Sequence, residues 1–181
     1  MGKPKSLLLF DDITFLEHIT SQLKYSSVDR TIVVFGADAD RINREISLSG
    51  IHPVIHKDYK KGQFSSLIAG LKSVPAETEA VLICLADHPF ITKDIINRMI
   101  DIYKKNKPPV IVPVYQGQRG YPVLFSSSVF HELLSAPEDF GDDYVVNKHA
   151  EDVYEFETEE KGVIIGINMP KDYNIFFGAE P

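Results

Sequence analysis

The amino-acid sequence predicts an α/β protein with a doubly wound, mostly parallel β-sheet. Short apolar runs rich in β-branched residues alternate with amphipathic helical patterns along most of the 181 residues, and the links between them are short. Two of these runs are apolar at nearly every position, which is typical of strands covered by helices on both faces. We therefore expect a single domain over residues 1–181, long enough to bury roughly 70 % of the surface of the unfolded chain.

The first two thirds of the chain supply the regular part of this pattern. Apolar residues recur at helical spacing from Phe15 to Leu23, which predicts a helix beginning near Asp12. Asp38 or Asp40 is a suitable N-cap for a second helix, which we expect to be ended by Gly50. The other expected elements are strands over residues 31–36, 52–56, 81–86 and 109–115, and helices over residues 66–71 and 92–105.

The pattern changes after residue 115. A short strand over residues 122–125, a helical segment over 129–134, an acidic turn-prone stretch over 136–145 and two final strands over 151–158 and 162–169 are expected, followed by a closing helix with Pro170 at its first position. We expect this region to form a lobe over the sheet edge. The opening is also unusual, because the chain begins with a loop and a helix where such sheets normally begin with a strand.

The charge of the chain excludes some classes of partner. The formal net charge is −7 and the isoelectric point is about 5.3, which argues against nucleic acid, since its binders need a basic surface. The apolar run at residues 7–10 is too short for a signal peptide, and we expect no membrane partner. The single cysteine, Cys84, lies in an apolar strand and is expected to be structural, which points to the cytoplasm.

Asp87 is the first candidate for a functional residue. It directly follows the apolar strand over residues 81–86 and precedes His88 and Pro89. In an open parallel sheet, ligands bind outside the carboxyl ends of the strands, where Asp87 would hold a hard cation or a phosphate. The alternative is a helix N-cap or a turn-stabilising side chain. Thr92 is the better cap for the next helix, which favours the functional interpretation.

A second candidate is the loop that contains Gly62, Ser65 and Ser66. It precedes a helix, whose free N–H groups suit an anion or a ribose hydroxyl. The alternative is plain helix capping by Ser65 or Ser66.

Basic side chains in loops could gather at the same edge of the sheet as Asp87. They are Lys3, Lys5, Lys60, Lys61 and Arg119. Their convergence on one aspartate suits a magnesium-bound triphosphate. The sequence has no P-loop and no dinucleotide-binding glycine motif. No side-chain nucleophile is required if the attacking group is a phosphate monoester, which is already ionised at neutral pH.

Six stretches, taken in order, resemble the MobA-like nucleotidyltransferase family, and most closely its branch related to molybdenum cofactor cytidylyltransferase. They are MGKPKSLLLF (residues 1–10), FLEHI (15–19), YKKGQFSSLIAGL (59–71), AVLICLADHPFIT (80–92), IVPVYQGQRGYPVLF (111–125) and NMPKDY (168–173). Their order and spacing hold over essentially the whole chain. The resemblance implies a Rossmann-like nucleotidyltransferase fold in one domain over residues 1–181.

The implied reaction is transfer of CMP from CTP, or of GMP from GTP, to the terminal phosphate of molybdopterin, with release of pyrophosphate. The implied cofactor is Mg²⁺, and the implied partner of the product is a molybdenum hydroxylase. Lys5 would contact the nucleotide phosphates and Asp87 would bind the metal. Gly2 and Pro4 would shape the phosphate loop. The remaining implied roles are nucleotide binding by Gly62, Ser65 and Ser66, and substrate binding by Arg119 and Gly120.

Three differences from the family pattern modify these expectations. The family opens with a strand and a glycine-rich loop of the type LAAGxSSR, and neither precedes residue 1, so we expect the first strand to be missing and CTP binding to be impaired. The family's DxDTP-type motif is replaced by residues 166–170, which leaves Asn168 as a neutral, weaker metal ligand. An arginine expected near the pterin is replaced by acidic residues between Glu138 and Asp143, which would repel a phosphorylated acceptor.

Two other functions stay open. The differences at Gly166, Asn168 and Asp143 favour a non-catalytic, nucleotide- or pterin-binding accessory protein for molybdenum hydroxylase maturation. A sugar-phosphate nucleotidyltransferase on the same fold is the third interpretation, although no sugar-specific feature is visible.

Overall fold

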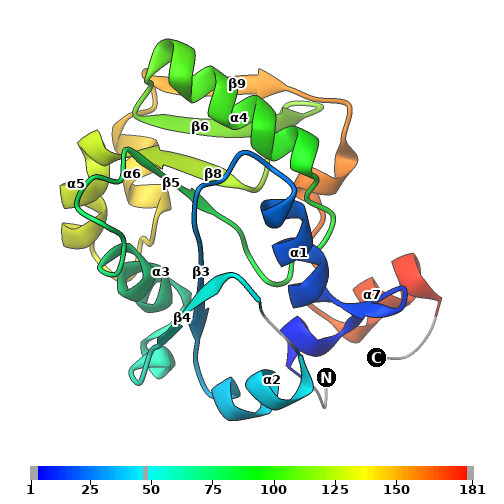
Figure 1. Ribbon diagram of the computed structural model, residues 1–181. Helices are drawn as coiled ribbons and strands as arrows, with labels where there is room; N and C mark the ends of the chain where they lie inside the picture. The colour runs from blue at the N-terminus through cyan, green and yellow to red at the C-terminus, as the bar shows by residue number, and fades with distance from the viewer. Residues whose placement is uncertain (1–3, 47–48, 179–181) are drawn as a thin grey trace.

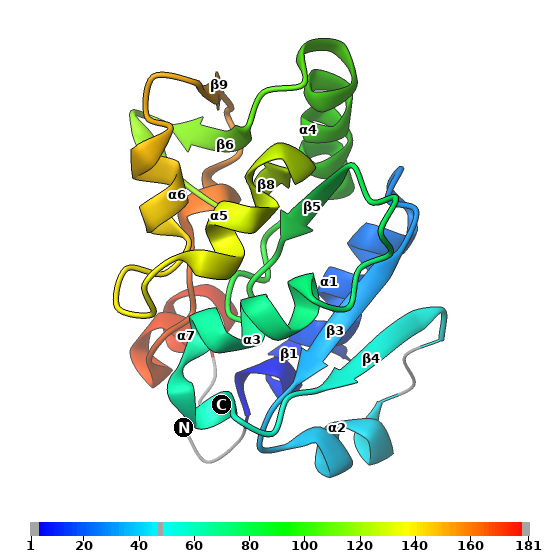
Figure 2. The same ribbon diagram turned by 90° about the vertical axis from the view of Figure 1, so that its left-hand side faces the viewer.

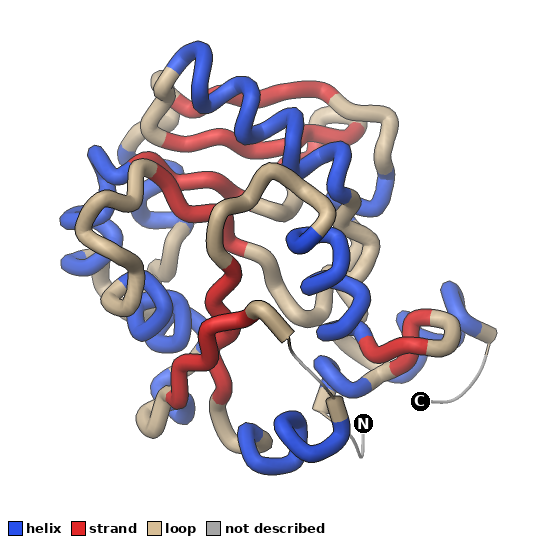
Figure 3. The backbone as a smooth tube through the Cα atoms, in the orientation of Figure 1, coloured by secondary structure: helices blue, strands red, loops and turns tan. Residues whose placement is uncertain are grey.

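The computed structural model describes residues 4–46 and 49–178 (Figure 1). The strands are β1 (Leu9–Phe10), β2 (Ile13–Thr14), β3 (Thr31–Phe35), β4 (Ile51–Ile55), β5 (Ala80–Ile83), β6 (Val110–Tyr115), β7 (Gln118–Arg119), β8 (Val123–Ser126) and β9 (Val153–Glu157). The α-helices are α1 (Phe15–Lys24), α2 (Ala39–Glu45), α3 (Gln63–Leu71), α4 (Lys93–Asn106), α5 (Phe130–Ser135), α6 (Asp143–Lys148) and α7 (Pro170–Phe177). Short 3₁₀ turns η1 (Lys5–Leu7), η2 (Tyr59–Lys61), η3 (Ser127–Val129) and η4 (Lys161–Ile164) complete the chain. Strands and helices alternate along the backbone (Figure 3).

The main sheet has the order β5-β8-β6-β7, with β9 paired to β6. Strand β8 runs antiparallel to both β5 and β6, whereas β9 runs parallel to β6. Strands β3 and β4 form a parallel pair, and the arrows of β3 and β5 point the same way in Figure 2. Five strands therefore share one direction, and the predicted doubly wound, mostly parallel α/β fold is confirmed.

Two helix starts show how local sequence sets the boundaries. Helix α1 begins after Thr14, whose side chain accepts a hydrogen bond from the Glu17 amide, while the Thr14 amide donates one to the Glu17 carboxylate. This capping box places the start later than the expected position near Asp12, where the chain instead turns between β1 and β2. Helix α4 is capped by Thr92 through the amide of Ile95, as predicted.

Three expectations for the second half are wrong. Residues 162–169 form no strand but contain η4, because their backbone groups bond to neighbouring loops: the Val163 carbonyl accepts from the Tyr121 amide and the Ile167 amide donates to Asp87. Part of the stretch expected to be a turn forms helix α6. Strand β8 lies inside the main sheet between β5 and β6, not in a lobe over its edge.

Helices cover both faces of β5. Val81 and Ile83 pack on one face against a core that includes Leu71 of α3. Leu82 packs on the other face against Ile19 of α1 and residues of α4. All four residues of β5 are nevertheless only partly buried, because the edge of β5 opposite β8 faces a cavity. No helix in the described ranges is long and apolar enough to cross a membrane.

Candidate active site

The ammonium group of Lys5 connects two polar side chains at the carboxyl end of β5. Its Nζ atom lies 2.9 Å from Oδ2 of Asp87 and 2.8 Å from Oδ1 of Asn168. The Asp87 side chain is 20 % exposed and the Lys5 side chain 36 % exposed, so all three groups are accessible to a ligand from solvent.

Different parts of the chain hold these three groups in place. Lys5 begins η1, directly after Pro4, whose carbonyl accepts a hydrogen bond from the Leu7 amide. Asp87 follows β5, and its carbonyl accepts from the Ile167 amide over 2.7 Å. The loop that carries Asn168 is fixed by Asp172 of α7, whose carboxylate accepts hydrogen bonds from the amides of residues 168 and 169.

The site lies at the mouth of a cavity of about 1340 Å³. Lys5, Asp87, Ser66 and Tyr121 line it at the end where β5 finishes, and the apolar residues of β3 and β5 line its length. The amino end of α3, from Gln63 onward, faces the same mouth, where its unpaired N–H groups favour an anion.

The donor set suits Mg²⁺. Carboxylate and amide oxygens of Asp87 and Asn168 both reach a single ammonium group, so they converge on one centre of positive charge. Mg²⁺ prefers oxygen ligands and usually takes one or two carboxylates, with the rest from water and substrate phosphates. The described residues contain no group of three or more His, Cys, Asp or Glu side chains that could hold a metal.

Comparison with known proteins identifies the family. Residues 1–153 match the family described as the MobA-like NTP transferase domain. The chain belongs to this family. Membership makes it a nucleotidyltransferase, as the sequence stretches around Lys5, Gly62 and Asp87 indicated.

The relatives of this MobA-like nucleotidyltransferase include enzymes for both nucleotides. The molybdenum cofactor cytidylyltransferase of Escherichia coli (strain K12) is 26 % identical over 179 residues, which cover 96 % of this chain and 86 % of that protein. A probable molybdenum cofactor guanylyltransferase of Bacillus cereus (strain G9842) is 23 % identical over 120 residues, covering 65 % of this chain and 57 % of that protein.

Solved structures share the fold over nearly the whole chain. The crystal structure of Rv0371c from Mycobacterium tuberculosis H37Rv has a TM-score of 0.88 at 25 % identity and covers 99 % of this chain and 91 % of its own. The complex of Rv0371C with manganese from the same organism has a TM-score of 0.86 at 25 % identity, with coverages of 98 % and 94 %.

The glycine and serines ahead of α3 have different positions in this MobA-like protein. Gly62 precedes the helix with a φ of 107°, a conformation that favours glycine. Ser66 lines the cavity, whereas the Ser65 hydroxyl bonds to the Gly62 carbonyl and to Nε2 of His56. In the described chain α3 has no side-chain N-cap, so the capping interpretation of Ser65 and Ser66 is wrong.

The expected cluster of basic side chains does not form among the described residues. Lys61 pairs with Asp58 on the same turn at 3.3 Å, and Arg119 of β7 pairs with Glu155 of β9 at 2.5 Å. Of the four expected basic residues that the structure describes, Lys5 alone lines the main cavity. Gly2 and Lys3 lie outside the described residues. Lys61 and Arg119 instead form ion pairs with Asp58 and Glu155, and the sequence spacing does not reveal these pairs.

Arg119 and Gly120 border a second, smaller cavity of about 270 Å³, together with Tyr121, Asp142 and Asp143. Position 120 has room only for glycine, because a Cβ atom there would lie 2.3 Å from the carbonyl oxygen of Val163. The glycine therefore allows the hairpin β6–β7 to pack against the loop at Val163.

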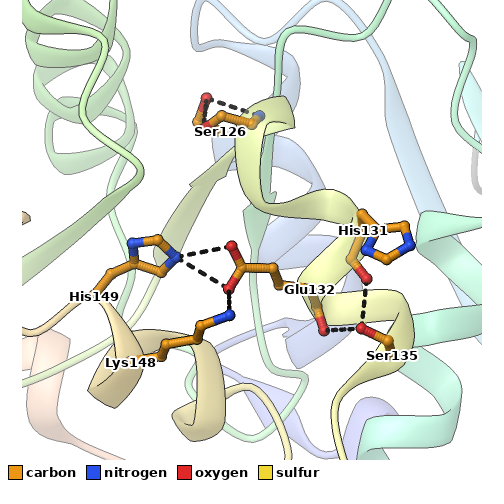
Figure 4. A network of polar contacts seen from close by, with 7 residues as sticks. Ser126, His131, Glu132, Ser135, Lys148 and His149 are labelled. Carbon is orange, nitrogen blue, oxygen red and sulfur yellow. Dashed lines mark hydrogen bonds and ion pairs between the residues drawn. The ribbon is translucent and has the colours of Figure 1, made fainter.

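The acidic segment at residues 138–143 faces the site. It contributes Glu138, Asp139, Asp142 and Asp143 to the lining of the main cavity. Burial raises the pKa of Asp142, and the neighbouring Asp143 adds to this effect. Contacts between α5 and α6 hold the segment, because Glu132 accepts from Lys148 at 2.8 Å and pairs with His149 at 3.1 Å (Figure 4).

His88 and Tyr121 are neighbours of the site that were not predicted as site residues. Their ring centroids lie 5.0 Å apart. Nδ1 of His88 is buried and has no hydrogen-bond partner within the described chain. Burial lowers the pKa of His88, although Asp87 partly opposes this effect, so the imidazole is neutral at pH 7. The position of His88 next to Asp87 in the sequence was the only available indication.

Proposed function

We propose that this MobA-like nucleotidyltransferase transfers CMP from CTP to the terminal phosphate of molybdopterin and releases pyrophosphate. The observation that carries the proposal is the convergence of Lys5, Asp87 and Asn168 at the end of β5. The similarity to the Escherichia coli cytidylyltransferase over 96 % of the chain supports CTP over GTP. The product would pass to a molybdenum hydroxylase.

The residues of the site act by charge and alignment. The acceptor phosphate oxygen attacks the α-phosphorus of CTP, and the bond to the bridging oxygen of pyrophosphate breaks. Lys5 offsets negative charge on the triphosphate in the transition state. Asp87, with Asn168 as the weaker ligand, would hold Mg²⁺, which supplies further charge neutralisation when bound. The manganese complex of the mycobacterial relative supports a divalent cation in this fold.

The nucleotide and the acceptor occupy different sides of this arrangement. Ser66 and the amino end of α3 contact the nucleotide, with Gly62 giving the backbone access, and Pro4 directs the loop that carries Lys5. Arg119 and Gly120 border the smaller cavity and belong to the acceptor side. Ser65 acts indirectly, by fixing the loop through Gly62 and His56.

A second function is favoured by the acidic segment. Carboxylates at residues 138–143 line the cavity mouth, and they would repel an acceptor phosphate. A non-catalytic accessory protein that binds a nucleotide or the pterin would not need to bring the two phosphates together. Binding without turnover is the behaviour that separates this function from the enzyme.

The test is pyrophosphate release from CTP and from GTP, with molybdopterin and Mg²⁺ present. We expect release with CTP and a large loss in Lys5→Met, with Lys105→Met on the exposed side of α4 as the matched control. Calorimetric binding of CTP without pyrophosphate release would favour the accessory protein. Failure to bind either nucleotide would contradict both proposals.

A further inference from the structure

We propose that the hydroxyl group of Tyr121 donates a hydrogen bond to the acceptor phosphate at the boundary between the main cavity and the smaller one. The attacking oxygen of that phosphate then lies toward the nucleotide, and the rest of the acceptor lies in the smaller cavity. The inference rests on the proposed function for the chemistry of the acceptor, a phosphate monoester. It adds to that function a residue that positions the acceptor.

Tyr121 lies where the two cavities adjoin. It lines the main cavity, whose mouth holds Lys5 and Asp87, and it also lines the smaller cavity of about 270 Å³. Within the described parts of the chain, Asp142 and Asp143 are the other residues that line both cavities. A ligand that reaches from one cavity into the other therefore passes these three side chains.

This boundary is poor in groups that attract a phosphate. Ionised carboxylates such as those of Asp142 and Asp143 only accept hydrogen bonds, and they repel a phosphate. Arg119 lines the smaller cavity, but its guanidinium is paired with Glu155 at 2.5 Å. Of the three side chains shared by both cavities, Tyr121 therefore supplies the hydrogen-bond donor.

The hydroxyl of Tyr121 is protonated and available for a ligand. Burial raises the pKa of Tyr121, and the negative charge of Asp142 adds to this effect, so the hydroxyl keeps its proton well above neutral pH. The hydroxyls of Tyr103 and Tyr173 donate to backbone carbonyls. Within residues 4–46 and 49–178, by contrast, no group forms a hydrogen bond with the hydroxyl of Tyr121.

Three contacts hold the ring of Tyr121 in place. Its amide donates to the Val163 carbonyl over 2.8 Å, and its ring packs against the core cluster that includes Val123. The third contact is with His88, whose ring centroid lies 5.0 Å away. His88 directly follows Asp87 in the chain, so one short segment positions both the carboxylate and the tyrosine ring. The hydroxyl is thus preorganised, which favours alignment of a reacting group.

The hydrogen bond leaves the atoms of the proposed reaction balanced. One oxygen of the acceptor phosphate forms the new bond to the α-phosphorus of CTP, while the bond to the bridging oxygen breaks and pyrophosphate leaves. Tyr121 donates to a second oxygen of the same phosphate and keeps its proton throughout. No base is required, because the attacking oxygen is already ionised.

The test uses inorganic phosphate as a probe for the acceptor phosphate. Its binding to the full chain is followed by NMR at the amides of Gly120 and Asn147, which border the smaller cavity, with and without Mg²⁺ and an α,β-methylene analogue of CTP. Tyr121→Phe removes only the hydroxyl and should raise the dissociation constant for phosphate at least tenfold, as expected for a hydrogen bond to a charged group. The matched control is Tyr154→Phe, an exposed tyrosine of β9, and it should bind phosphate as the unmodified protein does.

A second measurement uses turnover. In Tyr121→Phe the KM for molybdopterin should rise and kcat should fall, while the KM for CTP stays the same. Phenylalanine keeps the ring and its packing, so a purely structural role for Tyr121 would leave all three constants unchanged. Thermal unfolding of Tyr121→Phe should match that of the unmodified protein, since the hydroxyl bonds to no described group.

Asp143→Asn provides an independent variant. It removes one negative charge from the boundary and should tighten phosphate binding. Unchanged phosphate affinity in this variant, equal affinity in Tyr121→Phe and the unmodified protein, or no phosphate-dependent shift at the two amides would each overturn the proposal. Phosphate binding that depends on Tyr121 in a protein that releases no pyrophosphate would support this contact and contradict the proposed reaction.

Discussion

Lys5 and Asp87 form an ion pair of 2.9 Å although 82 positions separate them in the chain. The pair is partly exposed, so it contributes little to folding stability. Its importance is geometric, because it places a cation and a carboxylate of the proposed reaction at one point. Four predictions test the site and its surroundings.

Asp87→Ala is predicted to remove the metal dependence of CTP binding. The variant loses the only carboxylate that contacts Lys5 within the described residues, and turnover should fall by about a hundredfold or more, as for other preorganised charged groups. Calorimetry with and without Mg²⁺ measures the first effect and pyrophosphate release the second. Asp101→Ala, on the exposed face of α4, is the control and should behave as the unmodified protein. Unchanged metal dependence in Asp87→Ala would contradict the assignment.

Asn168→Asp is predicted to strengthen metal binding. The substitution adds a second carboxylate beside Asp87, and affinity for divalent cations rises with ligand charge. Titration with Mn²⁺ should give a dissociation constant lower by about tenfold. Asp172→Asn is the companion variant, since it weakens the bonds that hold the loop of Asn168 and should weaken Mn²⁺ binding. Equal affinity in all three proteins would place the metal elsewhere.

His88 is predicted to make the protein less stable in mild acid. Burial lowers the pKa of His88 from its ordinary value, so the unfolded chain binds this proton more readily than the folded protein does. The free energy of unfolding therefore falls as the pH drops below about 6.5. Urea denaturation at pH 7.5 and pH 5.5 should show a smaller fall for His88→Gln. The exposed His131→Gln is the control, and an equal fall in both variants would refute this role for His88.

Gly120→Ala is predicted to destabilise the fold by about 1–3 kcal/mol, as overpacking commonly does. The new Cβ atom would lie 2.3 Å from the Val163 carbonyl oxygen, so the hairpin and the loop must move apart. Thermal unfolding measures the change. Gly117→Asn is the matched control, because Gly117 has a φ of 78° with open space around it, and asparagine tolerates that conformation. A Gly120→Ala protein as stable as its control would show that the contact is not rigid.

Much of the fold could be predicted from the sequence because it depends on local patterns. The capping residue Thr92 and the apolar spacing after it define α4. The apolar run over residues 81–86 predicted β5, which the structure places at Ala80–Ile83, so the strand was predicted but its end was placed too late. Residues 162–169 are rich in apolar β-branched residues, as a strand is, but they form no strand and the first of them belong to η4, because neighbouring loops satisfy their backbone groups. The sequence of these residues does not show which hydrogen-bond partners their backbone groups have in the folded protein.

The candidate site, too, was predictable from the sequence only in part. By itself the sequence determined the fold class, the family resemblance and the position of Asp87 at the end of an apolar strand, since these depend on residue type and spacing along the chain. The tertiary structure alone decided that Lys5 and Asn168 meet at Asp87, that Arg119 pairs with Glu155, that the acidic segment faces the cavity, and that β3 and β5 stand apart. These are contacts between residues distant in sequence, and their energies depend on packing and charge in three dimensions, which no local pattern encodes.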